Sequence, residues 1–464
     1  MPNVERTEST VKTWKINIQP YAHQREAILK AIQYNSYALL AEPGTGKTPI
    51  AIELIARRNI PTLIICPLSI IESVWMEKIK EWHPGGHPVN LWKNKKKLLS
   101  CYQLKLDSNH IGIVNYEGAA KLPRWYLDQI KFLIADESSR LKDPNAKITR
   151  FLIGPITGRV PSLTDSIPHR LIMSGTPAPN SPMEYWSQMA MVNKLLLGDH
   201  YYRFRSEHFR SYGFGGYMWS VKSESKNWIM DQVKKQSYYI TKKDCLDLPD
   251  QIFETKKFEL DAGAKKAYQE MYKTNVAILK GAAVLGANEL AKIMKLRQIT
   301  SGFLIDSQGS AIPISDKKMD ILKETLNELG NSQVIIWCQF HFEIEAIMKL
   351  LGEKACSLYG DMTQGDKEKA IDDFISGAKQ YLVSHPKSGG VGLTFVNCSY
   401  NIYYSMDYSY ESFKQSQDRT YRIGQKNKVT YFFLLADATI DEIIYKALQK
   451  KESISEAMLQ LINA

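Results

Sequence analysis

The sequence predicts an α/β protein with two lobes, each built on a parallel β-sheet. Short apolar runs rich in β-branched residues recur along the chain, and enough residues for a helix separate each run from the next, as in buried parallel strands. A glycine-rich turn follows one of these runs and leads into a helical pattern. With 464 residues, the chain is also too long for one compact core of the usual size.

The strand-like runs fall into two groups. The first group lies at residues 37–41, 62–66, 111–115, 132–136 and 170–174. The pattern weakens between about 180 and 300, and a second group follows at residues 334–338, 381–384, 401–405 and 430–435.

From these groups we expect three segments. An N-terminal lobe spans 1–245 and includes a loop-rich aromatic segment at about 195–230, a linker and helical insertion span 246–310, and a C-terminal lobe spans 311–464. The C-terminal lobe carries an amphipathic helix near its end, because apolar residues recur there at helical spacing. These residues are Ile440, Ile443, Ile444, Ala447 and Leu448.

Composition excludes several classes of protein. The chain is 44% hydrophobic and 23% charged, and its net charge of +11 with a pI near 9.0 suits either an anionic partner such as nucleic acid or an ordinary basic cytosolic protein. The six cysteines are scattered singly and no Cys/His group has zinc-ligand spacing, so we expect reduced thiols and no zinc. The N-terminus lacks the apolar core of a signal peptide, and no apolar run approaches a membrane span. We therefore expect a soluble, intracellular and cytoplasmic protein without a membrane partner.

The segment AEPGTGKT (41–48) has the form of a phosphate-binding loop. Glycines are required there because backbone N–H groups wrap the phosphates and a Cβ would obstruct them. Lys47 is placed to reach the β- and γ-phosphates, and the hydroxyl of Thr48 is placed to bind Mg²⁺. The expected ATP contacts in this loop are Glu42, Pro43, Gly44, Thr45, Gly46, Lys47 and Thr48.

The apolar run FLIAD ends in two carboxylates, Asp136 and Glu137. In a phosphate-loop protein the first carboxylate holds Mg²⁺ against Thr48. The second can orient and deprotonate the water that attacks the γ-phosphate. A hydrolase needs this second carboxylate and a kinase does not, so the pair favours hydrolysis of a nucleoside triphosphate.

Near the C-terminus, QSQDRTYRIGQ (415–425) places two arginines on one stripe. Gln415, Arg419 and Arg422 stand at i, i+4 and i+7, so on a helix they share a face, and Gly424 is placed to end that helix. An ordinary buried face would carry Leu or Ile at this spacing. The stripe instead predicts two guanidinium groups that bind an anionic partner.

Further motifs follow one another along the chain. The first half contains YAHQREAI (21–28), ICPLSIIESVWMEKIKEW (65–82), DESS (136–139) and MSGTPAPN (173–180). The second half contains VIIWCQF (334–340), YGDMTQGDKEKAIDDF (359–374), SHPKSGGVGLTF (384–395) and the segment 415–452. Together with the phosphate loop, these motifs resemble those of superfamily 2 helicases, in particular the SWI/SNF-type DNA translocases, over most of residues 20–452.

The resemblance implies two RecA-like lobes with ATP and Mg²⁺ in the cleft between them. In this reading Gln24 contacts adenine, Gly392 adds to the ATP site, and the second lobe supplies an arginine finger to the γ-phosphate. Arg422 is the first choice for that finger. Arg419 either shares the role or holds its helix against the motif at 384–395. Residues expected to couple the lobes are Ser174, Gly175, Thr176 and Gln415.

The motif positions also imply contacts with DNA. The expected residues are Ser69, Asn115, Tyr116, Ser384, Ser388 and Thr394. Hydroxyls and amides at such positions bind phosphates, which carry no base information, so weak sequence preference and strong salt dependence are expected.

The chain departs from the family pattern at a few positions. Ala41 and Thr45 stand where the family usually has an acidic residue and leucine, and Ser139 stands where the acidic motif closes with histidine. The insertions around the lobe junction look short. These features favour a compact, phage- or bacterial-type translocase, in the host cytoplasm if phage-encoded, that acts on bare or branched DNA.

The resulting expectation is an ATP-dependent DNA translocase or helicase that remodels forked or branched DNA in replication, recombination or repair. Alternatives are a motor subunit of a restriction or recombination complex, a remodeller that displaces proteins, a nucleotide-dependent clamp without turnover, and an RNA helicase. Two surface segments stay open. The run WKNKKK (92–97) is a DNA contact or a solvated surface, and RFRSEHFRSYGFGGYMW (203–219) is a base-stacking wedge or an aromatic mini-core.

Overall fold

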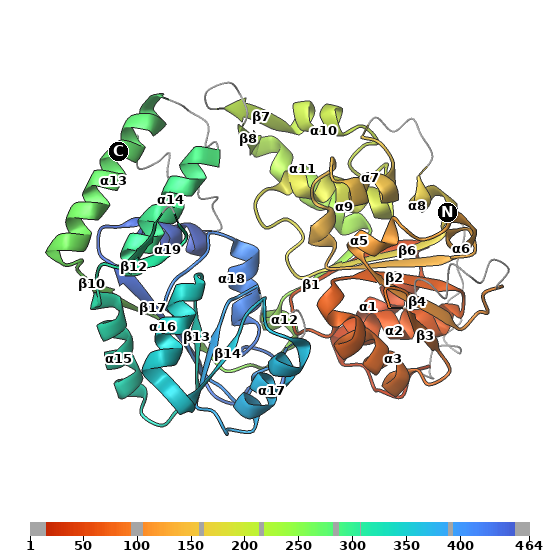
Figure 1. Ribbon diagram of the computed structural model, residues 1–464. Coiled ribbons are helices and arrows are strands. Elements are labelled where there is room, and N and C mark those ends of the chain that lie inside the picture. The colour runs from red at the N-terminus through yellow and green to blue at the C-terminus, as the bar shows by residue number, and fades with distance from the viewer. Residues whose placement is uncertain are drawn as a thin grey trace. The chain divides into compact units, whose positions relative to one another are not determined.

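The computed structural model describes residues 15–93, 105–156, 162–212, 218–281, 287–306, 308–387 and 393–450 (Figure 1). The chain divides into two compact units. The first comprises Met1–Arg210 and Val221–Leu246, and the second comprises Ser211–Ser220 and Asp247–Ala464. Each unit contains one large parallel sheet, which confirms the predicted fold class.

The first unit is built on a seven-stranded sheet with the order β3-β4-β2-β5-β6-β1-β9, in which every recorded pair is parallel. Its strands are β1 (Ser36–Ala41), β2 (Thr62–Cys66), β3 (His87–Asn90), β4 (His110–Asn115), β5 (Phe132–Asp136), β6 (His169–Ser174) and β9 (Ser237–Ile240). Because all strands run the same way, their carboxyl ends meet at one edge of the sheet, where α/β proteins bind ligands.

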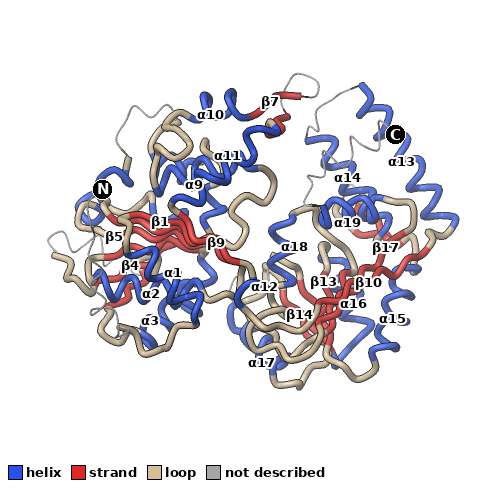
Figure 2. Tube along the Cα trace, turned by 180° about the vertical axis from the view of Figure 1, so that it is seen from behind, coloured by secondary structure: helices blue, strands red, loops and turns tan. Residues whose placement is uncertain are grey.

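Helices cover both faces of this sheet. In Figures 1 and 2, helices α1, α2 and α3 lie on one side, and α9 and α11 lie on the other. The helices of the first unit are α1 (Ala22–Ile32), α2 (Lys47–Arg58), α3 (Glu77–Trp82), α5 (Tyr116–Ala119), α6 (Arg124–Leu127), α7 (Lys147–Ile153), α8 (Leu163–Ser166), α9 (Tyr185–Val192), α10 (Tyr201–His208), α11 (Ser223–Lys235) and α12 (Lys242–Cys245). Short 3₁₀ turns are η1 (Leu68–Ile70), η3 (Ser138–Leu141) and η4 (Pro182–Glu184), and η2 (Ile71–Met76) is a π-helix. Strands β7 (Phe209–Tyr212) and β8 (Met218–Val221) form a separate two-stranded sheet.

The second unit is built on a six-stranded parallel sheet with the order β10-β17-β16-β13-β15-β14. Its strands are β10 (Gln251–Phe258), β13 (Val334–Trp337), β14 (Ala355–Leu358), β15 (Tyr381–Ser384), β16 (Tyr400–Tyr403) and β17 (Val429–Ala436). The helices are α13 (Ala262–Gly281), α14 (Ala287–Thr300), α15 (Lys317–Leu329), α16 (His341–Leu351), α17 (Gln364–Ile375), α18 (Tyr410–Gln417) and α19 (Ile440–Lys450), with a 3₁₀ turn η6 (Gly352–Lys354). A small antiparallel hairpin joins β11 (Phe303–Ile305) to β12 (Ala311–Pro313).

The segment 246–310, expected as a linker and helical insertion, contributes a strand to this second sheet. Its strand β10 pairs with β17 from Gln251 opposite Val429 to Phe258 opposite Ala436. Most β10 side chains are exposed or half-buried, as on the edge of a sheet. The strand therefore lacks the apolar run by which the central strands are recognised.

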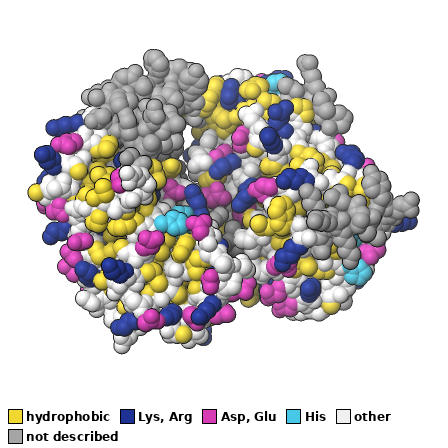
Figure 3. Space-filling model, viewed as in Figure 1, with side chains coloured by type: hydrophobic (Ala, Val, Ile, Leu, Met, Phe, Trp, Pro, Cys, Tyr) yellow, Lys and Arg dark blue, Asp and Glu magenta, His cyan; other side chains and the backbone are white. Residues whose placement is uncertain are grey.

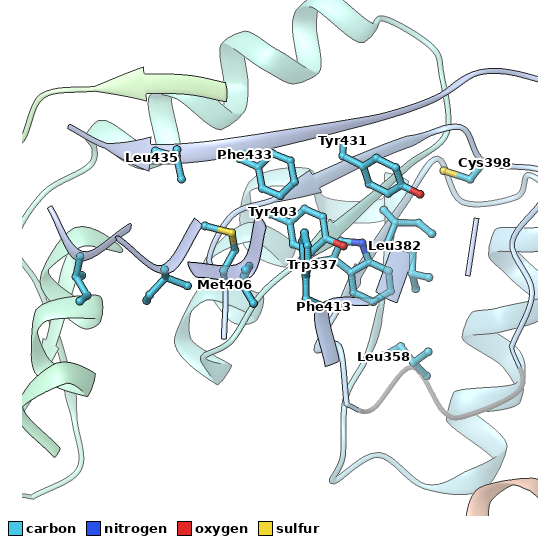
Figure 4. Packing of buried hydrophobic residues seen from close by; sticks show 14 of the residues in the cluster. Trp337, Leu358, Leu382, Cys398, Tyr403, Met406, Phe413, Tyr431, Phe433 and Leu435 are labelled. Atoms are coloured by element: carbon cyan, nitrogen blue, oxygen red, sulfur yellow. The ribbon is translucent and has the colours of Figure 1, made fainter. Parts of the chain in front are cut away.

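Aromatic rings form the core beneath the second sheet (Figure 4). The ring of Tyr403 on β16 stacks on that of Phe433 on β17, with centroids 4.9 Å apart. The indole N–H of the buried Trp337 on β13 donates to Asn401 Oδ1 at 3.1 Å. The hydroxyls of Tyr403 and Ser416 lie 2.6 Å apart, and this bond fastens α18 to the sheet.

Helix α19 lies over this core as its pattern predicts, with Ile440, Ile444, Ala447 and Leu448 buried and Ile443 partly buried. The helix also carries a charge into the interior. The Asp441 carboxylate accepts hydrogen bonds at 2.8 Å from Lys318 Nζ on α15 and from the Thr300 hydroxyl on α14. Both members of the ion pair are buried, and the two hydrogen bonds of Asp441 join helices α14, α15 and α19.

Surface charge is mixed on the face that Figure 3 presents, where Lys and Arg side chains are interspersed with Asp and Glu. The net charge of +11 is thus not gathered into one block on that face. No helix in the described ranges has the length and apolar character needed to span a bilayer.

We predict that Asp441→Ala destabilises the second unit by about 3–5 kcal/mol, because it leaves the Lys318 ammonium buried without its partner. Urea unfolding of the full chain, monitored by fluorescence and circular dichroism, measures the change. The matched control is Asp320→Ala, which breaks an exposed pair with Lys323 on the same helix α15 (3.0 Å) and should cost at most about 1 kcal/mol. Equal losses for the two variants would contradict a special role for the buried pair.

Candidate active site

The phosphate loop joins β1 to α2 and has a defined conformation. Gly44 and Gly46 have φ angles of +84° and +86°, a region that side chains with a Cβ rarely adopt. The Thr45 hydroxyl donates to Glu42 O at 2.7 Å, and Lys47 Nζ donates to Ala41 O at 2.8 Å. The loop is therefore closed on itself, and its lysine lies against the backbone of its own strand end.

A second segment supports this loop from the side. Gln24 on α1 accepts a hydrogen bond from Tyr21 N at 2.9 Å and donates to Thr45 O at 3.2 Å. A Cβ built on Gly46 would lie 2.0 Å from Gln24 Nε2, so the glycine allows this contact. His23, which the sequence analysis did not single out, has its Nε2 2.8 Å from the same Thr45 carbonyl.

The acidic strand end lies two strands from the phosphate loop, with β6 between β1 and β5. Asp136 is buried, and its two carboxylate oxygens accept hydrogen bonds from Trp75 Nε1 and from Glu137 N, each at 3.0 Å. Burial raises the pKa of Asp136, while the Lys47 charge acts in the opposite direction. The lysine and the carboxylate are thus electrostatic neighbours.

Glu137 adopts a left-handed backbone conformation with φ +56°. For a residue with a side chain this costs roughly 1–2 kcal/mol. The Tyr116 hydroxyl donates to Asp136 O at 2.7 Å, next to the strained residue. Glu137 thus follows the buried Asp136 in a strained turn at the carboxyl end of β5.

The SGTP motif lies between these two parts. In the sheet register Leu40 pairs with Ser174, and Asp136 pairs with Met173. The Ser174 hydroxyl accepts a hydrogen bond from Thr176 N at 3.1 Å. A Cβ built on Gly175 would lie 2.5 Å from the ring of Pro43 in the phosphate loop, so motif and loop touch here without room for a side chain.

Gln188 on α9 joins the acidic motif to the SGTP motif. Its Oε1 accepts from the Ser138 hydroxyl at 2.8 Å, and its Nε2 donates to Pro177 O. The side chain is fully buried. A single glutamine within a helix gives no sequence signal for this role.

The donor set at this edge suits Mg²⁺, which prefers oxygen ligands and keeps several sites for water and substrate phosphates. The Thr48 hydroxyl and the Asp136 carboxylate are the protein oxygens that would hold it. Within the part of the chain that the structure describes, no three His, Cys, Asp or Glu side chains gather as a metal site of the protein alone would require.

In the second unit the two arginines meet at one carbonyl. Helix α18 ends at Gln417, so Arg419 and Arg422 lie in the turns beyond it, and the prediction of one helix face was wrong. Their Nη1 atoms nevertheless both donate to Leu393 O, at 3.4 Å from Arg419 and 3.2 Å from Arg422. Burial lowers the pKa of Arg422, and the neighbouring Asp418 opposes that shift.

The backbone binds these two motifs together. Phe395 N donates to Arg419 O at 2.8 Å, while Gln415 lies on α18 with Nε2 3.4 Å from Glu411 Oε1. Arg419 is buried and Arg422 half-buried, which makes Arg422 the more accessible of the two.

The residues expected to touch DNA differ in exposure. Ser69 is exposed beside Leu68, whose exposed fraction is 52%. Asn115 and Tyr116 are buried, and the amide of Asn115 donates to Glu117 Oε2 at 2.7 Å. Of these three residues, only Ser69 presents its side chain on the surface, because the other two are anchored inside the sheet edge.

The expected contacts of the second unit divide in the same way. Ser384 is buried, and its hydroxyl donates to Leu358 O at 3.0 Å. Thr394 is half-buried. Ser388 and Gly392 lie outside the described residues.

The two open surface segments are described in part. Lys93 of the first forms an ion pair with Glu72 at 3.0 Å, and residues 94–97 lie outside the described ranges. The second contains a small core, with the buried rings of Phe204 and Phe209 5.6 Å apart, and an exposed Tyr202 under the Arg205 guanidinium at 5.1 Å. Residues 213–217 of this segment are also outside the description.

Comparison with known families gives two matches. Residues 8–302 match the SNF2-related domain, and residues 317–424 match the helicase conserved C-terminal domain. The first match alone covers more than half of the chain.

Individual relatives resemble the chain over almost its whole length. Protein p41 of the Acyrthosiphon pisum secondary endosymbiont phage 1 is 25% identical, over 95% of this chain and 98% of that protein. The ISWI chromatin-remodeling complex ATPase ISW1 of Saccharomyces cerevisiae is 23% identical over 96% of this chain. The human DNA annealing helicase and endonuclease ZRANB3 is 22% identical over 94% of this chain. The chain spans 40% of the length of each of the latter two.

Among solved structures, the SWI2/SNF2 ATPase core of Sulfolobus solfataricus in complex with double-stranded DNA is similar to the chain. It is 21% identical, with a TM-score of 0.45, over 95% of this chain and 92% of that one.

We predict that Gly175→Ala weakens nucleotide binding at least about fivefold, because the added methyl group would push Pro43 and the phosphate loop aside at an overpacking cost of about 1–3 kcal/mol. Equilibrium titration with a fluorescent, non-hydrolysable ATP analogue measures this change. The matched control is Gly365→Ala in α17, where a Cβ meets nothing within 4 Å. Unchanged affinity in the Gly175 variant would show that the loop moves freely past the motif.

Proposed function

The chain belongs to the SNF2-related family of ATPase motors, and from this premise we propose that it couples ATP hydrolysis to movement along duplex DNA. The observation that carries the proposal is the edge of the first sheet. Lys47, Glu137 and Thr176 follow the carboxyl ends of the neighbouring strands β1, β5 and β6. A phosphate ligand, a general base and a coupling motif are therefore carried by three adjoining strands.

The chemistry assigned to the first unit follows from these positions. Lys47 binds the β- and γ-phosphates once it leaves Ala41 O, and backbone N–H groups of the loop cradle the same phosphates. Glu137 orients the attacking water and takes its proton. Thr48 and Asp136 would hold Mg²⁺, which would neutralise charge on the phosphate oxygens.

We propose that the second unit completes the site with arginine. Arg422 is the principal finger, because its side chain is the more accessible of the pair, and Arg419 holds the turn through its backbone bond to Phe395. Both guanidinium groups donate to Leu393 O, which is their hydrogen-bond acceptor when no nucleotide phosphate is bound. Since the finger lies in a different unit from Lys47, hydrolysis would depend on closure of the two units and would drive a stepping cycle.

The proposed DNA contact of the first unit is the exposed turn with Leu68 and Ser69 at the carboxyl end of β2. Hydroxyls and backbone amides there suit phosphates, so binding should be weakly sequence-specific and strongly salt-dependent.

The substrate that we propose is forked or branched DNA, as met in replication, recombination and repair. Similarity to a protein named as a DNA annealing helicase supports this choice. A second candidate is a motor whose output depends on partner subunits. The similarity to an ATPase named as part of a chromatin-remodeling complex supports that alternative.

We predict that Glu137→Gln lowers DNA-stimulated turnover by about 10²–10⁴ because the general base is lost. Arg422→Ala should lower it by about 10³–10⁵ because the charge on the transferred phosphoryl group is no longer balanced. A coupled phosphate-release assay gives the rates, and the ATP-analogue titration should show that Glu137→Gln still binds nucleotide.

The charge-matched control for the arginine is Arg124→Ala, at an exposed pair with Asp128 (2.7 Å). Its turnover should equal wild type. Full turnover of Arg422→Ala, with loss in Arg419→Ala instead, would transfer the finger to Arg419.

A panel of nucleic acids tests the substrate. We predict that forked and four-way DNA stimulate turnover more than linear duplex, and that RNA stimulates least. Two unrelated duplex sequences should bind with equal affinity. A plot of the logarithm of the binding constant against the logarithm of the salt concentration should have a slope of about −0.9 for each phosphate contacted. Stimulation that appears only when host or phage proteins are added would favour the partner-dependent motor.

A further inference from the structure

One continuous segment of the first unit contains both an exposed turn and a buried side chain that contacts Asp136. Leu68 and Ser69 are exposed, whereas Trp75 on the π-helix η2 is completely buried. The Trp75 indole N–H donates to Asp136 Oδ2 at 3.0 Å. The proposed DNA contact and the proposed metal ligand are therefore linked by less than two turns of helix and one hydrogen bond.

The helix that makes this link is unusual. A π-helix has i→i+5 hydrogen bonds, occurs mostly as a single turn, and is frequent at functional sites. Here Glu77 N donates to Glu72 O, five residues earlier. The buried apolar residues Ile71, Trp75 and Ile79 lie along the inner side of η2 and α3.

The outer side of the same helix is anchored as well. The side chain of Asn90 makes two hydrogen bonds: its Nδ2 donates to Glu72 Oε1 at 2.7 Å, and its Oδ1 accepts from Trp92 N at 3.0 Å. The hydrogen bonds from Asn90 and the Lys93 charge lower the pKa of Glu72. Because Ser69 in η1 and Trp75 in η2 belong to consecutive helical turns with no loop between them, a displacement of the exposed turn would shift the indole.

We propose that Trp75 is a positioning residue that ties the exposed turn at Leu68 and Ser69 to the Asp136 carboxylate, so that DNA bound at this turn strengthens binding of Mg²⁺ and nucleotide. This inference rests on the proposed function and names the path by which DNA regulates the ATP site. Because coupling between two ligands is reciprocal, Mg²⁺–nucleotide must strengthen DNA binding by the same factor.

A purely structural role for Trp75 makes a different prediction. The indole would then fill the core and satisfy its N–H on the nearest carboxylate. Its removal would lower stability and leave the coupling between DNA and nucleotide intact. Binding equilibria distinguish the two roles, whereas turnover alone does not.

The test uses Trp75→Phe in the full chain, which retains an aromatic ring and removes the donor. Binding of the fluorescent, non-hydrolysable ATP analogue is measured against Mg²⁺ concentration without DNA. We expect the half-saturating Mg²⁺ concentration to rise about 10-fold or more, since partners that orient metal ligands typically contribute 10–100-fold to affinity. An unchanged Mg²⁺ requirement overturns the proposal.

The matched control is Trp186→Phe. Trp186 is also buried in the first unit, and its indole N–H donates to Gly198 O at 2.9 Å, so the substitution removes one equivalent hydrogen bond away from the site. This variant should keep the wild-type Mg²⁺ requirement. An equal shift in both variants assigns the effect to general loosening and overturns the proposal.

A second variant covers the case in which Trp75→Phe does not fold. Site-specific replacement of Trp75 by benzothienylalanine keeps the size and shape of the ring system and substitutes sulfur for the N–H. Thermal unfolding checks the fold, and the same Mg²⁺ titration is then applied. A wild-type Mg²⁺ requirement in this variant overturns the proposal.

The coupling to DNA is measured in both directions. In wild type, saturating duplex DNA should lower the analogue dissociation constant about 5–150-fold, and saturating Mg²⁺–analogue should lower the DNA dissociation constant by the same factor. In the Trp75 variants both factors should approach one. Retained coupling in these variants overturns the DNA path.

The two titrations distinguish a failure of the proposed function from a failure of the role assigned to Trp75. If wild-type protein shows no stimulation of turnover by any nucleic acid, the proposed function fails and the DNA path fails with it. The Mg²⁺ titration without DNA still decides whether Trp75 positions Asp136. If wild type is stimulated but Trp75→Phe behaves as wild type in both titrations, only the inference about Trp75 fails.

Discussion

The parallel pairing of β1, β6 and β5 is the constraint on which the candidate site depends. Because β6 lies between the other two, and Leu40 pairs with Ser174 while Asp136 pairs with Met173, the three strands end level with one another. Segments far apart in sequence thereby reach one edge without long loops. The same register brings Gly175 against Pro43, so the spacing between strand ends leaves no room for a side chain there.

Buried polar contacts then fix what the sheet brings together. Gln24 holds the phosphate loop, Gln188 joins the two flanking motifs, and Trp75 holds the carboxylate, each through a specific donor and acceptor. Such contacts are expensive to leave unmade inside a protein, so each one restricts its segment to a narrow range of positions. In the second unit the backbone carbonyl of Leu393 accepts hydrogen bonds from Arg419 and Arg422 and so restricts the positions of both side chains.

Structure could be predicted from the sequence where a residue type is required by its local environment or by the backbone conformation. The central strands are apolar because both faces are covered, and the glycines of the phosphate loop are required by the backbone itself. Prediction failed where tertiary contacts decide. The polar edge strand β10 gave no apolar run, and α18 ends at Gln417 although the polar stripe continues beyond it. Burial of Asn115 and Tyr116, and the partners of Gln188 and Trp75, depend on neighbours distant in sequence, which residue spacing cannot reveal.

The left-handed backbone of Glu137 bears on how this protein can evolve. Glycine, or asparagine to a smaller degree, occupies that conformation with less strain, so replacing Glu137 with either would relieve a cost of roughly 1–2 kcal/mol while removing the carboxylate. Selection for thermal stability alone should therefore favour glycine at this position, whereas selection for turnover should favour glutamate. The residue found at 137 in laboratory-evolved lineages would thus record which of the two pressures had prevailed.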